Sequence, residues 1–226
     1  MKLNNLLAVV RDAYKKRGIR YMVCYGFRVF CRTYLEKNKR FFTFQNKQYN
    51  YFYHLYNSTC LNERAVEIPI VWKIAQDYQG KRILEVGNVL SHYFNFPHDI
   101  IDKYEKFSGV MNQDIVDFQP KEKYDLIVSI STLEHVDEIL PAIQNLEKCL
   151  APGGKIVITM PLGYNSQVDN LLNEGKIKFT EQYFLQKFSD FEWKEVNQSE
   201  VRGIKYDISR YSALGLVIGI IINGEG

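Results

Sequence analysis

The sequence predicts an α/β fold built on a parallel sheet, and three observations carry this prediction. Between residues 81 and 164, apolar runs of five or six residues alternate with polar or helical stretches. Such uninterrupted runs are typical of parallel strands that are buried on both faces. An acidic or polar residue stands at the carboxyl end of each run, where open α/β sheets bind their ligands. The length of 226 residues suits one sizeable domain with an appendage.

The composition predicts a hydrophobic core, and the excess of positive charge lies in the N-terminal part of the chain. Hydrophobic residues make up 46% of the chain, which argues against disorder. Residues 1–50 hold 12 Lys and Arg against two acids, whereas the remainder holds 17 against 24. A basic arm on an acidic domain indicates an anionic partner: a membrane surface, a phosphate-bearing substrate or nucleic acid. A solvated basic helix that covers the core is the alternative.

Cysteine usage and hydropathy predict a cytosolic protein without a metal site. The four cysteines have no CxxC pair and no metal-ligand spacing, so we interpret them as reduced thiols: Cys24, Cys31, Cys60 and Cys149. Polar and charged residues interrupt the first 20 positions, so no signal peptide is expected. The longest apolar run, Ala213 to Ile222, is about half a membrane span and is better explained as a buried strand.

The first part of the chain has amphipathic helical spacing. Apolar residues recur at steps of three and four over 3–17 and again over 19–35, with basic residues on much of the remaining circumference. Such a helix lies either on a membrane surface or on its own domain as a lid. Alternating aromatic and polar residues over 41–54 predict a hairpin around Asn46-Lys47. We therefore divide the chain into an arm with a hairpin, 1–60, and a domain, 61–226.

The domain has a regular succession of predicted elements. A helix over 62–78 contains Pro69, which predicts a kink or break, and Gly80 ends it. A second helix is expected over 133–150, a turn at Pro152-Gly153-Gly154, and a third helix near 180–188. The predicted strands are 82–86, 99–102, 109–111, 124–130, 155–160, 191–198 and 213–223.

Residues at two strand ends have the chemistry of a nucleotide site. Glu85 and Gly87 close the first strand, and a glycine there lets the backbone approach a ligand. Asp102 follows a second strand 17 residues later, where a carboxylate can accept hydrogen bonds from both hydroxyls of a ribose. Either acid alone could equally be an exposed loop residue. Their combination with further motifs is more specific.

The combined motifs resemble class I S-adenosylmethionine-dependent methyltransferases over residues 81–165. The segments that carry the resemblance are Glu85-Val86-Gly87, Asp102, Asp114-Ile115, Tyr124-Asp125-Leu126-Ile127, Leu133-Glu134-His135-Val136 and Leu150-Ala151-Pro152-Gly153-Gly154. The last two are similar to the small-molecule and sugar-type branch. The resemblance implies a Rossmann-like sheet of seven strands, mostly parallel, with helices on both faces. It also implies that 191–198 and 213–223 form an antiparallel C-terminal hairpin.

The resemblance also implies a cofactor, S-adenosyl-L-methionine, and the residues around it. Glu85, Gly87 and Asn88 are expected near its methionine part and Asp102 on its ribose. Asp114 and Ile115 are expected at the adenine, and the segment from Ser129 to Thr132, with Ser129 and Ser131, beneath the sulfonium.

The first motif departs from the family pattern, because Val89 stands where a glycine is expected. A β-branched residue resists positive φ and holds the backbone away from a ligand. Either the loop takes another path, with Asn88 in an unusual conformation, or cofactor binding has decayed.

Methyl transfer needs in-line positioning and, for a hydroxyl acceptor, a general base. His135 after the fourth strand is the first candidate base and His92 in the cofactor loop the second. Tyr164 and Asn165 follow the fifth strand and are expected in the acceptor pocket. Arg64 is expected at the cofactor carboxylate or the substrate, or else in an ion pair with Glu63 or Glu67.

These residues together predict a cytoplasmic methyltransferase that O-methylates a sugar or another glycan-related small molecule. Residues 1–40 are candidates for peripheral contact with the inner membrane surface. Two alternatives stay open: a non-catalytic binding protein with a degenerate cofactor site, and an RNA methyltransferase that uses the basic arm. Nucleic acid is disfavoured because Ser129-Ile130-Ser131-Thr132 replaces the Asn/Asp-Pro-Pro-aromatic motif of base-methylating enzymes. No oligomeric state follows from the sequence.

Overall fold

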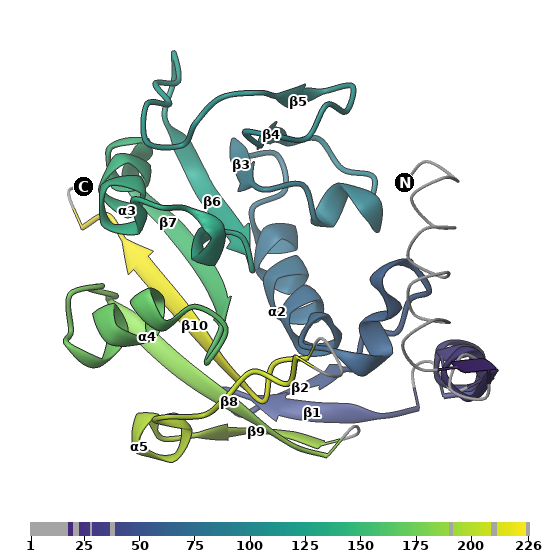
Figure 1. The fold of residues 1–226 in the computed structure, drawn as a ribbon. Helices are drawn as coiled ribbons and strands as arrows, with labels where there is room; N and C mark the ends of the chain where they lie inside the picture. Colours follow the sequence, from purple (N-terminus) through teal and green to yellow (C-terminus); the bar gives the residue numbers. More distant parts are fainter. Residues whose placement is uncertain are drawn as a thin grey trace.

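The computed structural model in Figure 1 describes residues 18–19, 23–27, 29–36, 39–189, 192–208 and 212–224. The helix predicted over 3–17 lies outside these residues. In the second predicted run, residues 23–27 and 29–30 are helical and continue into the π-helix η1 (Cys31–Leu35). The described part of that prediction is confirmed.

The predicted sheet is present, with eight strands in the order β5-β4-β3-β6-β7-β10-β8-β9. Its strands are β3 (Ile83–Val86), β4 (Asp99–Ile101), β5 (Val110–Met111), β6 (Tyr124–Ile130), β7 (Leu150–Pro161), β8 (Glu181–Ser189), β9 (Glu192–Val196) and β10 (Gly215–Ile222). The first five strands in this order are parallel, and β10, β8 and β9 are antiparallel to their neighbours. The mostly parallel α/β sheet with a C-terminal antiparallel hairpin is therefore confirmed. The predicted count of seven strands and the predicted pairing of 191–198 with 213–223 are wrong, because β8 lies between β9 and β10.

The helix predicted near 180–188 is wrong, since these residues form β8. Phe184 packs with the core on one face of the sheet, and its neighbour Leu185 packs with the core on the other. Opposite directions for consecutive side chains are the mark of a strand. β8 pairs with β10 on one side and with β9 on the other. It therefore brings the number of strands in the sheet to eight, and it forms the hairpin with β9.

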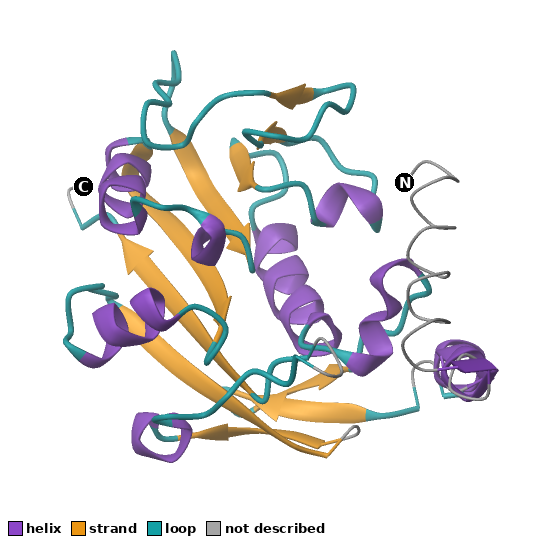
Figure 2. Ribbon diagram, viewed as in Figure 1, coloured by secondary structure: helices purple, strands orange, loops and turns teal. Residues whose placement is uncertain are grey.

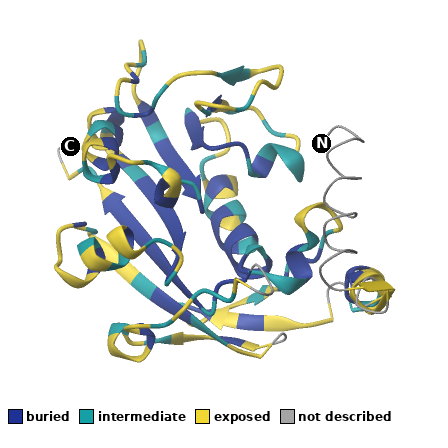
Figure 3. Ribbon diagram, viewed as in Figure 1, coloured by how far each residue is buried: buried dark blue, intermediate teal, exposed yellow. Residues whose placement is uncertain are grey.

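Helices cover both faces of the sheet (Figure 2). The α-helices are α2 (Arg64–Asp77), α3 (Ile139–Lys148), α4 (Ser166–Asn173) and α5 (Gln198–Val201), and short helical turns form η2 (Tyr56–Leu61), η3 (Leu90–His92) and η4 (Leu133–His135). One core cluster joins α2 to the sheet, and a second joins α3, α4 and α5 to its other face. Figure 3 shows the central strands buried between these layers.

Two predicted element boundaries need correction. The single helix over 133–150 is divided into η4 and α3, because Val136 is extended at φ −90° and ψ 125°. The Pro152-Gly153-Gly154 turn is an irregularity inside β7, whose pairing with β6 begins at Leu150 and resumes at Lys155. A Cβ on Gly154 would lie 2.9 Å from the Ala151 carbonyl oxygen, so the tight path needs glycine.

Pro69 does not break α2, contrary to the prediction. A proline has no N–H to donate to the carbonyl four residues earlier, which here is Ala65. The Phe52 N–H donates to the Ala65 carbonyl at 2.9 Å instead. The backbone group freed by the proline is thereby satisfied from another segment.

The predicted hairpin is confirmed as β1 (Phe41–Phe44) and β2 (Lys47–Asn50). Its turn residues are Gln45 and Asn46, one position earlier than expected, and both have positive φ, at 49° and 58°. Phe42, Phe44 and Tyr51 from this region share the core with α2. The division of the chain at residue 60 stays a prediction.

The loop after β7 depends on Gly163. Its φ is +76°, and an added Cβ would meet the Ile204 carbonyl oxygen and lie 2.7 Å from the Tyr206 nitrogen. Gly163→Ala should lower the free energy of unfolding by about 2–4 kcal/mol, since backbone must move. Gly175→Ala is the matched control, with φ +65° but no atom within 4 Å, and should cost only about 1 kcal/mol. Equal losses in urea denaturation would contradict this explanation.

Candidate functional site

A cavity of about 680 Å³ opens at the carboxyl ends of β3, β4 and β6. The loops that follow these strands wall it. The predicted site residues that line it are Arg64, Gly87, Asn88, His92, Asp102, Asp114, Ile115, Ser131 and His135. The predicted residues that do not line it are Glu85, Ser129, Tyr164 and Asn165. The sequence motifs therefore converge on one cavity, with four of the predicted residues outside its wall.

Gly87 sits where the loops after β3 and β6 approach each other. Its φ is +82°, and its N–H donates to the Ile101 carbonyl at 2.8 Å. An added Cβ would meet Thr132 Oγ1 and lie 2.8 Å from Thr132 Cγ2. Both backbone conformation and space thus require glycine at this position.

The loop after Gly87 takes a path that suits a β-branched residue. Val89 has φ −114°, and Asn88 is not among the described residues with positive φ. Glu85 is fully buried, and its Oε1 accepts from the N–H groups of Val89 at 2.9 Å and Leu90 at 2.6 Å. The Glu85 carboxylate therefore holds the loop from behind the cavity wall.

Asp102 organises the loop after β4. Its Oδ1 accepts from the N–H groups of Tyr104 at 2.8 Å and Glu105 at 2.7 Å. Its Oδ2 accepts no hydrogen bond from the part of the chain that the structure describes. Asp102 lines the cavity, so this second oxygen can accept from a bound hydroxyl.

Asp114 and Ile115 lie together at the far end of the cavity. Asp114 Oδ2 accepts from Lys103 Nζ at 2.7 Å and Oδ1 accepts from the Val116 N–H at 3.1 Å. The hydrogen bond from Lys103 lowers the pKa of Asp114. Ile115 is buried beside it and gives this end an apolar floor.

Arg64 and Ser131 form the opposite wall. The Arg64 guanidinium donates through Nη1 to the Ile130 carbonyl at 3.0 Å, and the same nitrogen lies 3.8 Å from Glu67 Oε2. Ser131 has φ +41°, and its hydroxyl donates to Glu67 Oε1 at 2.6 Å. Arg64 therefore forms the expected ion pair with Glu67 and also lines the cavity.

Buried carboxyl groups gather behind this wall. Burial and the nearby Glu67 raise the pKa of Glu63, whose Oε2 accepts from the Ala213 N–H at 2.9 Å. Burial raises the pKa of Glu134 to about 8, and its Oε2 has no hydrogen-bond partner. The folded chain therefore keeps Glu134 largely protonated at neutral pH.

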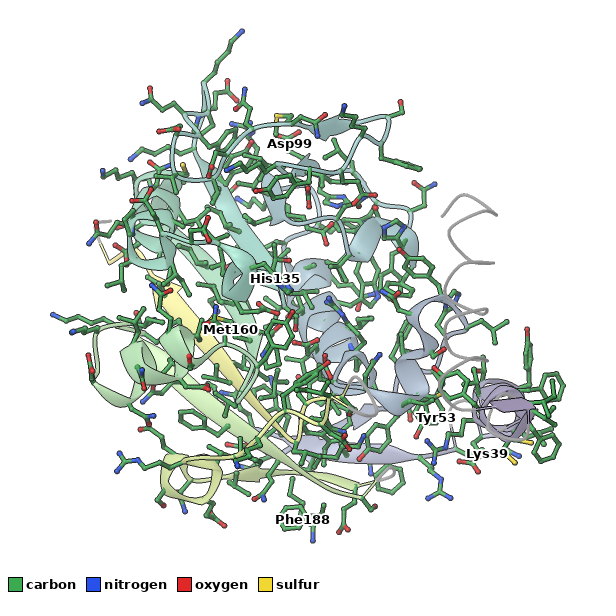
Figure 4. The ribbon with its side chains drawn as sticks, viewed as in Figure 1. Lys39, Tyr53, Asp99, His135, Met160 and Phe188 are labelled. Atoms are coloured by element: carbon green, nitrogen blue, oxygen red, sulfur yellow. The ribbon has the colours of Figure 1, made fainter. Side chains whose placement is uncertain are left out.

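His135 stands at the centre of the view in Figure 4. Burial and the positive charge of Arg64 lower its pKa, although its side chain is 57% exposed. The Tyr164 ring meets the imidazole edge-on at 5.2 Å, and the Tyr206 ring meets Tyr164 at 5.1 Å. His135 is thereby unprotonated at neutral pH and lies next to an aromatic surface.

The remaining predicted site residues have structural contacts. Asn165 donates to the Glu134 carbonyl at 2.7 Å and caps α4 by accepting from the Gln167 N–H. Ser129 is fully buried in β6. The His92 ring lies tilted against the Tyr56 ring, with 4.6 Å between the ring centroids.

A family model described as "Methyltransferase domain" matches residues 54–199, which is more than half of the chain. The chain belongs to this methyltransferase family. It is an enzyme that uses S-adenosylmethionine, so the alternative of a non-catalytic binding protein is not supported.

Solved structures of other methyltransferases resemble this chain at low identity. N-methyltransferase NodS from Bradyrhizobium japonicum WM9, in complex with S-adenosylhomocysteine, is 17% identical, with TM-score 0.45 over 74% of this chain and 95% of that one. An S-adenosylmethionine-dependent methyltransferase from Mesorhizobium loti is 20% identical, with TM-score 0.36 over 43% and 53%. One from Clostridium acetobutylicum ATCC 824 is 11% identical, with TM-score 0.37 over 70% and 89%. The curated proteins give no match.

Sequence reasoning missed several residues that line the cavity of this methyltransferase, among them Lys103 and Tyr104. Both follow Asp102 directly, so their position after a strand end was the available signal. Thr132, which was expected beneath the sulfonium, lines the cavity. Within the described ranges, no group of three His, Cys, Asp or Glu could hold a metal ion.

The raised pKa of Glu134 has a consequence for stability. Between the ordinary value of 4.5 and about 8, the unfolded chain has lost the proton that the folded chain keeps. Stability therefore falls as pH rises through this range, by at most about 5 kcal/mol from this group. Glu134→Gln should flatten the dependence of the unfolding free energy on pH between 5 and 8.

The control for this prediction is Glu147→Gln, on the exposed face of α3, which should keep the wild-type slope. Glu63, whose pKa is also raised, accounts for a residual slope in Glu134→Gln. An unchanged slope in Glu134→Gln would show that Glu134 ionises as freely in the folded chain as in the unfolded one.

Proposed function

We propose that this methyltransferase O-methylates a sugar or another glycan-related small molecule. The observation that carries the proposal is the placement of His135: an imidazole with lowered pKa lines a cavity of cofactor size and touches an aromatic surface. A hydroxyl acceptor needs a base that is unprotonated near neutral pH. His135 meets this requirement, and His92 on the other side of the cavity is the second candidate.

We assign the cofactor to the cavity walled by the loops after β3 and β4. The cavity volume of about 680 Å³ suits a ligand of the size of S-adenosylmethionine. The unused Asp102 Oδ2 suits a ribose hydroxyl, and the apolar Ile115 beside Asp114 suits a purine. Gly87 and Asn88 would hold the methionine part, with Arg64 near its carboxylate, while Ser131 lines the wall and Glu85 holds the loop behind it. When bound, S-adenosylmethionine supplies an electrophilic methyl group.

The chain's own residues then have simple tasks. His135 Nε2 or Nδ1 accepts the proton of the acceptor hydroxyl. Tyr164, 47% exposed, offers a flat ring to the apolar face of a sugar. Asn165 fixes the backbone of Glu134 and so the position of His135 beside it.

A test of this proposal is formation of S-adenosylhomocysteine with a panel of free and nucleotide-linked sugars. His135→Gln should lower kcat about 100-fold with little change in cofactor KM, because it removes a proton acceptor. Asp102→Ala should raise the cofactor KM instead. Methylation of amines or RNA but of no sugar would refute the acceptor class, and wild-type kcat in His135→Gln would refute the base.

We further propose that the arm contacts the inner, cytoplasmic membrane surface. Its described residues expose large apolar side chains at more than half of their surface: Ile19, Val23, Phe27, Phe30, Tyr34 and Leu35. The excess of Lys and Arg over acids in residues 1–50 complements anionic lipid. Buried Arg32 ties the arm to η2 by donating to the Cys60 carbonyl at 3.3 Å, and η2 contributes Tyr56 to the cavity. Among the described residues, no helix could cross a membrane.

Sedimentation with vesicles tests the arm. Wild type should sediment with phosphatidylglycerol-containing vesicles and less with phosphatidylcholine alone. The double variant Phe27→Ser and Phe30→Ser, and deletion of residues 1–40, should abolish sedimentation while sparing cofactor affinity. Phe188→Ser, 53% exposed on β8, is the matched control and should sediment like wild type. If the variant that lacks residues 1–40 still sediments with the vesicles, the proposal is refuted.

A further inference from the structure

A buried histidine stands behind the cofactor loop. His98 precedes β4, and its side chain is only 3% exposed. Its Nε2 lies 2.8 Å from Glu85 Oε2, and its Nδ1 lies 2.9 Å from the Phe96 carbonyl oxygen. The other oxygen of the same carboxylate, Glu85 Oε1, accepts from the Val89 and Leu90 N–H groups. A continuous chain of hydrogen bonds thus runs from His98 to the cavity wall.

The partners of His98 define its charge. A carbonyl oxygen and a carboxylate can only accept, so both ring nitrogens must carry hydrogen. The geometry therefore indicates an imidazolium at His98 that donates to both acceptors. Burial alone would lower the pKa of His98, but the hydrogen bonds that His98 donates to Glu85 and to the Phe96 carbonyl outweigh burial and raise it. The geometry and the direction of the shift agree.

Aromatic side chains surround the His98–Glu85 pair and bury it from solvent. The Phe96 ring stacks on the imidazole at 3.8 Å and 3°, and Trp72 meets Phe96 edge-on. The charged groups that act on His98 are Glu85 and Asp99, the residue that follows His98. Asp99 in turn accepts from Arg82 at 3.4 Å and from the Tyr124 hydroxyl at 2.9 Å. With few competing donors, the Glu85 carboxylate depends on His98 for its third hydrogen bond.

We infer that His98 is a positioning residue for cofactor binding, which acts through Glu85 on the loop at Val89 and Leu90. In this chain the loop lacks a glycine at position 89, and the carboxylate fixes its path through two N–H groups. An imidazolium that donates to the second carboxylate oxygen keeps the carboxylate oriented toward the loop. The inference rests on the cofactor of the family and is independent of the acceptor proposed above.

The pair makes cofactor affinity depend on pH. Below the raised pKa, His98 donates to both partners. As pH rises through the raised pKa of His98, one ring nitrogen loses its hydrogen. That nitrogen can then no longer donate to the acceptor it faces, so the restraint on Glu85 weakens. Affinity should therefore decline as pH rises through the raised pKa of His98.

The test is calorimetric titration of S-adenosylhomocysteine into wild type, His98→Leu and His98→Gln from pH 6 to 9. His98→Leu should bind about tenfold more weakly, because the loop is no longer preorganised. His98→Gln keeps one donor for Glu85 without a titrating proton. It should retain part of the affinity and lose the wild-type decline with rising pH.

A matched control and a second readout separate positioning from general damage. Tyr124→Phe removes a 2.9 Å hydrogen bond to Asp99 without touching the loop and should bind like wild type. The Val89 and Leu90 amide resonances should shift with pH in wild type and stay fixed in His98→Gln, even if His98→Leu fails to fold. Wild-type affinity in folded His98→Leu, identical pH profiles for wild type and His98→Gln, or no binding by wild type would overturn the inference.

Discussion

The close approach of the loops after β3 and β6 is the constraint on which the site depends. Gly87 leaves no room for a side chain against Thr132, and its N–H is bonded to the end of β4. Three neighbouring parallel strands are thereby locked together at their carboxyl ends. The cavity exists because the chain must turn away from this contact on each strand, and polar groups of the turning loops line it.

Buried carboxyl groups beneath the cavity show how differently one fold can treat the same chemistry. Glu85 is fully buried, yet both of its carboxylate oxygens have partners: two backbone N–H groups on one and the His98 imidazole on the other. Glu134 has an oxygen with no partner, and the folded chain keeps its proton instead. Burying such groups opposes folding, since desolvation of an acid is unfavourable. Their concentration around one cavity is what a functional site, rather than a stability-optimised core, would have.

The sequence was sufficient for the layers and for the main wall of the cavity. Parallel strands appear as uninterrupted apolar runs, and the residues after them, Gly87, Asp102 and Ser131, need no tertiary information to be found. The eighth strand was missed because the run 181–189 has no clean alternation, and its pairing with two neighbours decided its conformation. The partners of Glu85 were missed for a related reason. Val89 looks unfavourable in a glycine pattern, whereas His98 becomes relevant only when β4 lies beside β3.

The proline inside α2 has a consequence for where this domain can be cut. Because Pro69 cannot donate, the Ala65 carbonyl depends on the N–H of Phe52. Phe52 lies two residues before the segment that the family model matches, which begins at 54. A fragment trimmed to the family boundary would therefore leave an orphaned carbonyl within the helix that carries Arg64 and Glu67. A fragment that keeps every backbone group of this helix paired must therefore begin at or before Phe52, ahead of the residues that the family model matches.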